Sequence, residues 1–216
     1  MEVTYLGVSS FRIKGQDTTI ITDPSPGKDP SPGKGAPRPA TVVTVSHEHP
    51  RHNQLDRVTD VRKVVRGPGE YEIGPAFILG LATFHDNHKG QERGRNTVYR
   101  IDLEGISFCH LGDLGHQLTA AHVEELGAVD VLFIPVGGVS TIDAAQAAEM
   151  VGLLGAKIII PMHYKIAGLA DDLGELETFL RHIGLGQTEP QARLNITRTL
   201  LSQETTRTIV MEPPKG

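Results

Sequence analysis

The sequence has one cysteine, Cys109, among its 216 residues. A single cysteine excludes an internal disulfide bond and any zinc knuckle built from cysteine sulfur. If this chain holds a metal ion, the ligands are therefore imidazole nitrogens and carboxylate oxygens.

The chain also lacks a long hydrophobic run and an excess of positive charge. No stretch of about 18 apolar residues occurs, and the N-terminus, Met1-Glu2-Val3-Thr4-Tyr5, begins as folded structure rather than as a signal peptide. We therefore expect a cytoplasmic protein without a membrane partner. The net charge of -5 gives no general attraction to nucleic acid, which is therefore disfavoured as a partner. No pattern indicates an oligomeric state.

Turn residues and hydrophobic periodicity divide the chain into strands followed by alternating strands and helices. Polar–apolar alternation over residues 1–23 predicts two or three short antiparallel strands. Residues 24–39 nearly repeat Pro-Ser-Pro-Gly-Lys and predict a mobile loop, because prolines donate no ladder bonds. Further strands are predicted at 41–45, 61–65, 76–83, 96–101, 106–109, 131–134, 156–160 and 206–210, with turns at 67–69 and 104–105. Helices are predicted at 119–126, at 141–154 and near 171–182.

This order of elements predicts an α/β or α+β fold. Two strand-rich layers with helices outside them would satisfy it, as a four-layer α/β/β/α sandwich. The length fits one large domain or two small ones, and we predict a single domain over residues 1–216. Periodicity alone does not reach the four-layer arrangement, which depends on the motifs that follow.

Histidines cluster in the segment Ser46-His47-Glu48-His49-Pro50-Arg51-His52. In an extended chain, side chains two residues apart point to the same side, so His47 and His49 can aim at one point. Pro50 forces a turn, which would let His52 return to that point at the start of a helix. Neutral imidazoles arranged in this way are common zinc ligands. Taken alone, the segment could also be a solvated histidine-rich turn.

Three more predicted strands end in a histidine or an aspartate. Asp113 lies in a glycine-flanked turn, where a carboxylate can bridge two cations, orient a bound water or simply cap the turn. His85 and His163 each end an apolar strand. Strand ends hold ligands rigidly while the loops between them admit substrate. Four such strand ends together predict a metal site.

At these residues the sequence resembles the metallo-β-lactamase superfamily, over nearly the whole chain. Within it, the sequence is similar to a branch of small zinc-dependent hydrolases related to ascorbate-6-phosphate lactonases. The matching strings are Thr22-Asp23-Pro24, Ser46–His52, Gly67-Pro68-Gly69-Glu70-Tyr71, His85-Asp86, Arg93-Gly94-Arg95-Asn96-Thr97, His110-Leu111-Gly112-Asp113, Ile134-Pro135-Val136-Gly137-Gly138 and Pro161-Met162-His163-Tyr164. The resemblance implies the four-layer α/β/β/α fold and metal-dependent hydrolysis.

The resemblance also implies the ligands of two adjacent metal sites. These ligands are His47, His49 and His85 for site one, His52 and His163 for site two, and a bridging Asp113. The family's aspartate in the first motif falls on Arg51, whose guanidinium stays protonated and cannot ligate a metal.

Two arrangements of Arg51 are possible. Either it turns away and leaves a weakened second site, or its cation fills that site. Two unit charges about 4 Å apart repel by roughly 4 kcal/mol at an effective dielectric of about 20, and a divalent ion doubles this. We therefore expect one tightly bound metal at site one, with the second weak or absent. Zinc is the expected metal, although manganese and iron suit the same ligands.

One metal would suffice for hydrolysis. A zinc ion held by three histidines lowers the pKa of its water to about 7, so metal-bound hydroxide would attack an ester, a lactone or a phosphoester. Asp113 would orient that hydroxide, and Arg51, if it points inward, would stabilise an oxyanion or a substrate phosphate. His110 and His116 match no ligand position, and they either support the ligands or have no part in the site.

Two other functions stay open. A degenerate site retained for binding or regulation would also explain Arg51. A nuclease is the second, because relatives include nucleic-acid-processing enzymes, but those usually carry a further domain and basic clefts, which this length and charge disfavour. Likeness in fold does not choose among substrates.

Overall fold

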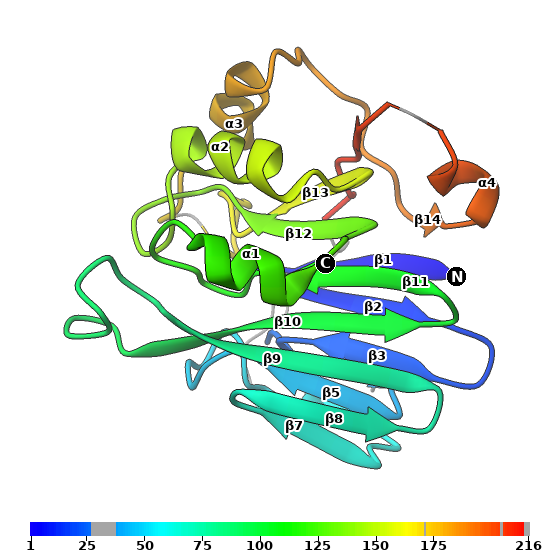
Figure 1. The fold of residues 1–216 in the computed structure, drawn as a ribbon. Helices are drawn as coiled ribbons and strands as arrows, with labels where there is room; N and C mark the ends of the chain where they lie inside the picture. Colours follow the sequence, from blue (N-terminus) through cyan, green and yellow to red (C-terminus); the bar gives the residue numbers. More distant parts are fainter. Residues whose placement is uncertain (27–37, 171, 204, 214–216) are drawn as a thin grey trace.

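The computed structural model of the chain describes residues 1–216 apart from 27–37, 171, 204 and 214–216. Two large β-sheets, of six and seven strands, lie against each other (Figure 1). The histidine and aspartate motifs follow strands of both sheets, so the packing of the sheets positions the site.

The six-stranded sheet has the order β14-β1-β2-β3-β5-β7. Its strands are β1 (Glu2–Gly7), β2 (Ser10–Lys14), β3 (Thr19–Thr22), β5 (Val42–Val45), β7 (Lys63–Arg66) and β14 (Leu194–Asn195). Neighbours β1, β2 and β3 are antiparallel, which confirms the prediction from polar–apolar alternation. Every second residue of β1 is buried, whereas β5 is buried on both faces.

The seven-stranded sheet has the order β15-β13-β12-β11-β10-β9-β8. Its strands are β8 (Gly69–Ile73), β9 (Ala76–Phe84), β10 (Arg95–Leu103), β11 (Ile106–His110), β12 (Val131–Pro135), β13 (Ile158–Met162) and β15 (Arg207–Thr208). The predicted strands omit β8, because Gly67-Pro68-Gly69 is typical of a turn. Strands β11, β12 and β13 are parallel and fully buried, so their carboxyl ends meet at one edge.

The helices begin where their capping residues place them. Helix α1 (Ala120–Leu126) starts after Thr119, as predicted. Helix α2 (Ala144–Leu154) starts at 144 rather than 141, because the Asp143 side chain accepts the backbone N–H of the third helical residue. The helices α3 (Leu176–His182) and α4 (Arg198–Leu201) follow, and α3 is shorter than predicted.

The prediction that a helix begins at His52 is wrong. After His52 the chain forms only the short 3₁₀ helix η1 (Leu55–Arg57). The Gln54 N–H bonds to Pro24 O at 2.9 Å, so this backbone is held by a distant segment rather than by a helical turn.

An apolar core lies between the two sheets. The rings of Phe11 and Phe133, one from each sheet, have centroids 4.3 Å apart, and the Tyr99 hydroxyl donates to Val45 O at 2.9 Å. A smaller apolar cluster, which includes Val43 of β5, lies on the outer face of the six-stranded sheet and is covered by Leu55 of η1. Helices α1, α2 and α3 gather beside β12 and β13 (Figure 1). The layers are those of the predicted α/β/β/α sandwich, with a 3₁₀ helix in one outer layer.

Most of the predicted mobile loop at 24–39 lies outside the described residues. Its last two residues are not a loop, because they form β4 (Arg38–Pro39) and pair with β6 (Val58–Thr59) in a small parallel sheet. In the part of the chain that is described, no helix has the length and apolar character needed to cross a membrane.

Candidate metal centre

The first histidine lies just beyond the end of strand β5, at the edge of its sheet. Ser46 and His47 follow the last residue of the strand directly. The chain then turns, with the His52 N–H bonded to His49 O at 2.9 Å, so that His52 returns beside His47. Their ring centroids are 4.5 Å apart, and their side chains are 6% and 1% exposed.

Asp23 supports both rings from behind. Its carboxylate accepts the Ser46 N–H at 2.7 Å and the Ser46 hydroxyl at 2.6 Å, and lies 3.2 Å from His52 Nδ1. Because the Ser46 hydroxyl proton points to Asp23, its oxygen accepts from His47 Nδ1, 2.9 Å away. Both imidazoles then carry a proton on Nδ1 and keep the Nε2 lone pair for a ligand. Neither Asp23 nor Ser46 has a role predicted from sequence.

A close backbone approach fixes the turn before Asp113. Gly112 has a φ of +58°, and a Cβ on it would lie 2.6 Å from Ser46 Cβ. Asn96 Oδ1 accepts the Asp113 N–H at 3.0 Å. The turn therefore admits glycine alone without displacing its neighbours, and it holds the carboxylate in one place.

The Asp113 carboxylate lies at the centre of four imidazoles. Its Oδ2 is 3.2 Å from His163 Nε2, 3.4 Å from the Nε2 atoms of His52 and His85, and 3.7 Å from His47 Nε2. Five residues from four strand ends thus converge on one point.

The other two histidines come from the seven-stranded sheet. The His85 N–H donates to Gly94 O at 3.1 Å directly after β9. His163 follows β13 in the left-handed region, with a φ of +52°, and its N–H donates to Val8 O at 2.8 Å. Such a conformation is uncommon for a residue other than glycine and is typical of functional sites.

Asp86 organises the loop that follows His85. Its carboxylate accepts four backbone N–H bonds of 2.8–3.0 Å, from His88, Gly90, Glu92 and Arg93. Burial acts to raise the pKa of Asp86, but these bonds outweigh it and lower the pKa to about 2. Asp86 therefore holds the loop in place. In the sequence, Asp86 stands out only as part of a string that resembles the family.

Burial and mutual charge set the protonation of the cluster. Burial lowers the pKa of His47 to about 4 despite Asp113, so this ring is neutral at pH 7. Burial also acts to lower the pKa of His52, but Asp113 and Asp23 outweigh it and raise that pKa. Burial acts to raise the pKa of Asp113, but His163 and His52 hold it well below its usual range. The same negative field that favours a proton on His52 favours a bound cation.

The donor atoms fit a metal ion. The Nε2 atoms of His47 and His52 are buried without a hydrogen-bond partner among the described residues. Three sets of ligand atoms each lie within 4.8 Å of one another, and these sets are His47, His85 and Asp113; His52, Asp113 and His163; and His47, His49 and His52. Imidazole nitrogen and carboxylate oxygen suit zinc, manganese or iron. The fold thus brings five of the six predicted ligands together around Asp113. The sixth, His49, lies at the exposed edge and groups with His47 and His52 rather than with His85 and Asp113, its predicted partners in site one.

Arg51 pairs with a carboxylate outside the cluster. Its Nη1 lies 2.9 Å from Asp172 Oδ1, and the two side chains are 36% and 60% exposed. Of the two arrangements considered for Arg51, this one matches a guanidinium turned away from site two. The Arg51 N–H donates to His49 Nδ1 at 3.2 Å.

His110 and His116 hold backbone segments near the ligands. His110 Nε2 donates to Ser9 O at 2.7 Å, and its Nδ1 accepts the Gly112 N–H at 3.2 Å. His116 Nε2 accepts the Phe84 N–H at 3.1 Å, at the end of β9. Neither belongs to a group that could hold a metal within the described residues.

A cavity of about 480 Å³ opens over the cluster. Besides the ligands, its walls include Arg51, Asp172, Val139 and Leu173. Val139 is 69% exposed, so an apolar side chain meets solvent at this cavity. The volume is that of a small-molecule site.

Two packed sheets with histidines and an aspartate at their strand ends define a metallo-β-lactamase fold. The chain belongs to the beta-lactamase superfamily domain family, whose model matches residues 2–163. The match ends at the last predicted ligand, His163. The narrower likeness to ascorbate-6-phosphate lactonases stays a prediction.

Individual relatives agree with this family. A protein of Nitratidesulfovibrio vulgaris named a metal-dependent hydrolase is 30% identical over 75% of this chain and 79% of its own. A crystal structure from Thermotoga maritima, described as a candidate zinc-dependent hydrolase of the metallo-β-lactamase superfamily, is 37% identical, covers 99% of both chains and has a TM-score of 0.78. A metallo hydrolase from Ignicoccus hospitalis is 20% identical, covers 99% of this chain and 96% of its own, and with a TM-score of 0.66 is similar in fold.

Proposed function

We propose that this chain is a metal-dependent hydrolase that cleaves an ester, a lactone or a phosphoester of a small molecule. The observation that carries the proposal is the convergence of four imidazole Nε2 atoms within 3.2–3.7 Å of Asp113 Oδ2. The names of the relatives from Nitratidesulfovibrio vulgaris and Thermotoga maritima support it.

We propose two adjacent sites. Site one holds one zinc ion tightly, and site two binds a metal weakly or not at all. Site one comprises His47, His49, His85 and Asp113, and site two comprises His52, His163 and Asp113. When bound, a zinc ion supplies a Lewis acid and lowers the pKa of a coordinated water to about 7.

The side chains of the cavity then direct the reaction. Asp113 orients the attacking water and accepts its hydrogen bond. Arg51 lines the same cavity but is paired with Asp172, so it would donate to an oxyanion or a substrate phosphate only after releasing that carboxylate. Hydrolysis breaks the C–O or P–O bond, the oxygen of water joins carbon or phosphorus, and its protons leave with the two products.

Metal analysis and hydrolysis assays test this proposal. The purified protein should hold about one equivalent of zinc and cleave 4-nitrophenyl acetate, a γ-lactone or bis(4-nitrophenyl) phosphate when supplied with zinc or manganese. The His47→Ala variant should lose both metal and activity. The matched control His182→Ala, which changes an exposed histidine of α3, should lose neither. Two tightly held equivalents in the wild type would contradict the argument from Arg51.

A degenerate binding protein is the second candidate, and the position of Arg51 motivates it. Loss of the family aspartate removes a carboxylate from site two. If the wild type cleaves none of these substrates and Arg51→Asp does not restore cleavage, the binding protein becomes the better description.

A further inference from the structure

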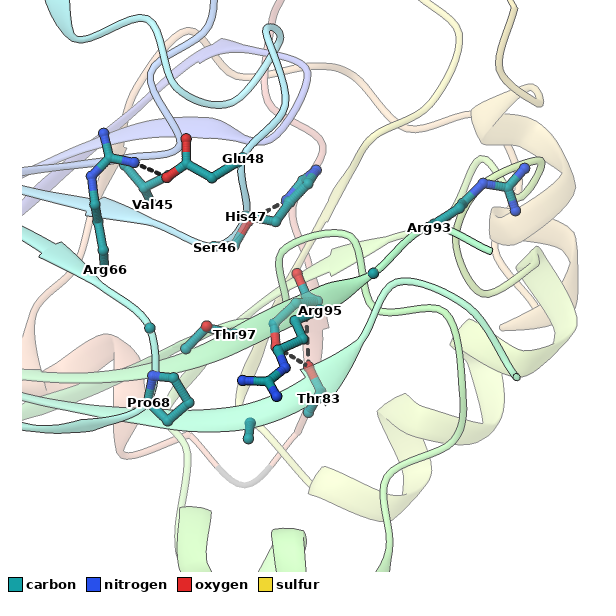
Figure 2. A pocket seen from close by; sticks show the side chains of 14 residues that line it. Val45, Ser46, His47, Glu48, Arg66, Pro68, Thr83, Arg93, Arg95 and Thr97 are labelled. Atoms are coloured by element: carbon teal, nitrogen blue, oxygen red, sulfur yellow. Dashed lines mark hydrogen bonds and ion pairs between the residues drawn. The ribbon is translucent and has the colours of Figure 1, made fainter. Parts of the chain in front are cut away.

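A second cavity adjoins the metal cavity. It has a volume of about 430 Å³ and shares His47, Glu48 and Arg93 with the metal cavity. Ala82 gives it an apolar lining together with Val45 and Pro68, which are labelled in Figure 2. The two cavities are therefore neighbours at His47, and a ligand that extends from one into the other would lie along this residue.

The second cavity also carries uncompensated positive charge. Arg66, Arg93 and Arg95 line it, but Figure 2 shows the Arg93 guanidinium directed away from the other labelled side chains. The one lining carboxylate, Glu48, is already paired with Arg66. Among the described residues, no ion pair engages Arg95, which is exposed. Figure 2 shows the Arg95 guanidinium turned toward Pro68, on the side of the cavity away from Glu48. A local excess of positive charge in a chain of net charge -5 favours an anionic ligand.

The chemistry of these residues defines the ligand. An arginine presents a planar fork of N–H donors that matches a carboxylate or a phosphate. Apolar side chains beside it bury a hydrocarbon segment, which contributes affinity but little orientation. An ester or lactone with an apolar segment and an anionic end would therefore place its scissile bond at the metal cluster.

We propose, building on the hydrolase function above, that the second cavity binds the apolar segment of an anionic substrate and that Arg95 pairs with the anionic group. Arg95 acts as a specificity-determining residue, and selects substrates that end in a carboxylate or a phosphate. Because the residue lies at the exposed start of β10, its replacement leaves the core intact.

A binding experiment tests the cavity independently of catalysis. Calorimetry on the metal-loaded protein compares 4-phenylbutyrate with its neutral analogue 4-phenylbutyramide. The wild type should bind the carboxylate about tenfold more tightly, which is the usual contribution of a charge-assisted hydrogen bond. Arg95→Gln should remove this preference, and Arg181→Gln, which changes an exposed arginine of α3, should keep it. Equal binding of the two compounds by the wild type, or a preference that survives in Arg95→Gln, would overturn the proposal.

A kinetic experiment connects the cavity to the reaction. The substrates are mono(4-nitrophenyl) glutarate and 4-nitrophenyl valerate, which share a leaving group and an acyl chain length. Arg95→Gln should lower the ratio of the two kcat/KM values about tenfold, mainly through KM. An unchanged ratio contradicts the proposal. If neither ester is cleaved while the carboxylate preference persists in binding, the hydrolase function fails and the anion site stands. Inhibition by phenyl phosphate and by phenylacetate separates a phosphate from a carboxylate preference.

Discussion

One short segment contains both the most and the least constrained side chains of the metal centre. His47 and His52 are buried and are held from behind by Ser46 and Asp23. His49 and Arg51, from the same turn, project into the exposed part of the cavity. His47 and His52, the inner pair, are therefore oriented before a metal binds. His49 and Arg51, the outer pair, are held only by the exposed Arg51–Asp172 ion pair and by the hydrogen bond from the Arg51 N–H to His49.

The two pairs also differ in where their protons lie. The Nδ1 of His47 and of His52 each donate, so Nε2 keeps its lone pair. The Nδ1 of His49 accepts the Arg51 N–H, which places the proton of a neutral ring on Nε2. His49 must therefore lose that bond or turn before it can ligate through Nε2. The difference predicts a graded response to mutation.

The largest effect should come from Asp113, on whose carboxylate four imidazoles converge. Asp113→Asn removes the central charge, and we expect metal affinity to fall by more than about 100-fold and hydrolysis to become undetectable. Metal content after dialysis measures the loss. Asp172→Asn, which neutralises an exposed carboxylate of the same cavity, is the control. Equal zinc content in Asp113→Asn and the wild type would contradict the assignment.

The support behind the inner pair should rank second. Asp23→Asn retains an acceptor for the Ser46 N–H but weakens the bonds that orient His47 and His52. Loss of such support typically lowers metal affinity about 10–100-fold, and the impaired buried bonds should lower the free energy of unfolding by about 1–3 kcal/mol. Zinc titration and urea denaturation measure the two effects, with the exposed Asp56→Asn as control. Unchanged zinc affinity would remove Asp23 from the site.

A direct comparison of the inner and outer histidines comes third. His47→Ala should lower zinc affinity more than about 100-fold, whereas His49→Ala should lower it about tenfold or less, because Asp113 and the four imidazoles around it remain. Competition with a chromogenic chelator gives both affinities. Equal losses would show that His49 is held as firmly as His47 once metal binds.

The smallest effect should come from the outer ion pair. The hydrogen bond from Arg51 lowers the pKa of Asp172 from its usual 3.8, so the pair stabilises the protein above pH 3.8 and ceases to do so as the pH falls through the lowered value. Because both side chains are exposed, Asp172→Asn should cost about 0.5 kcal/mol or less at pH 7. Thermal unfolding at pH 7 and below pH 3 measures this, and a difference that grows in acid would contradict it.

Much of this arrangement is readable in the sequence because the evidence for it is local. The β-branched run before Ser46 predicts β5, and a histidine or aspartate directly after an apolar strand predicts a ligand at the end of that strand. Glycines mislead where a strand begins in a turn, as at Gly69, the first residue of β8.

The remainder depends on contacts between distant segments. Asp23 lies 29 residues from His52, and Arg51 lies 121 residues from Asp172. No periodicity marks either partner. Whether Arg51 faces the metal or turns away is decided by a carboxylate that only the folded chain brings near it.

The proposed ligands are divided between the two sheets, since His47 and His52 follow a strand of the first while His85, Asp113 and His163 follow strands of the second. The two sets that include Asp113 each take ligands from both sheets, so neither is complete until the sheets have packed together, and a cation held by either set can enter only late in folding. A bound cation would then have to dissociate before the two sheets separate. It would therefore slow unfolding while leaving the folding rate nearly unchanged.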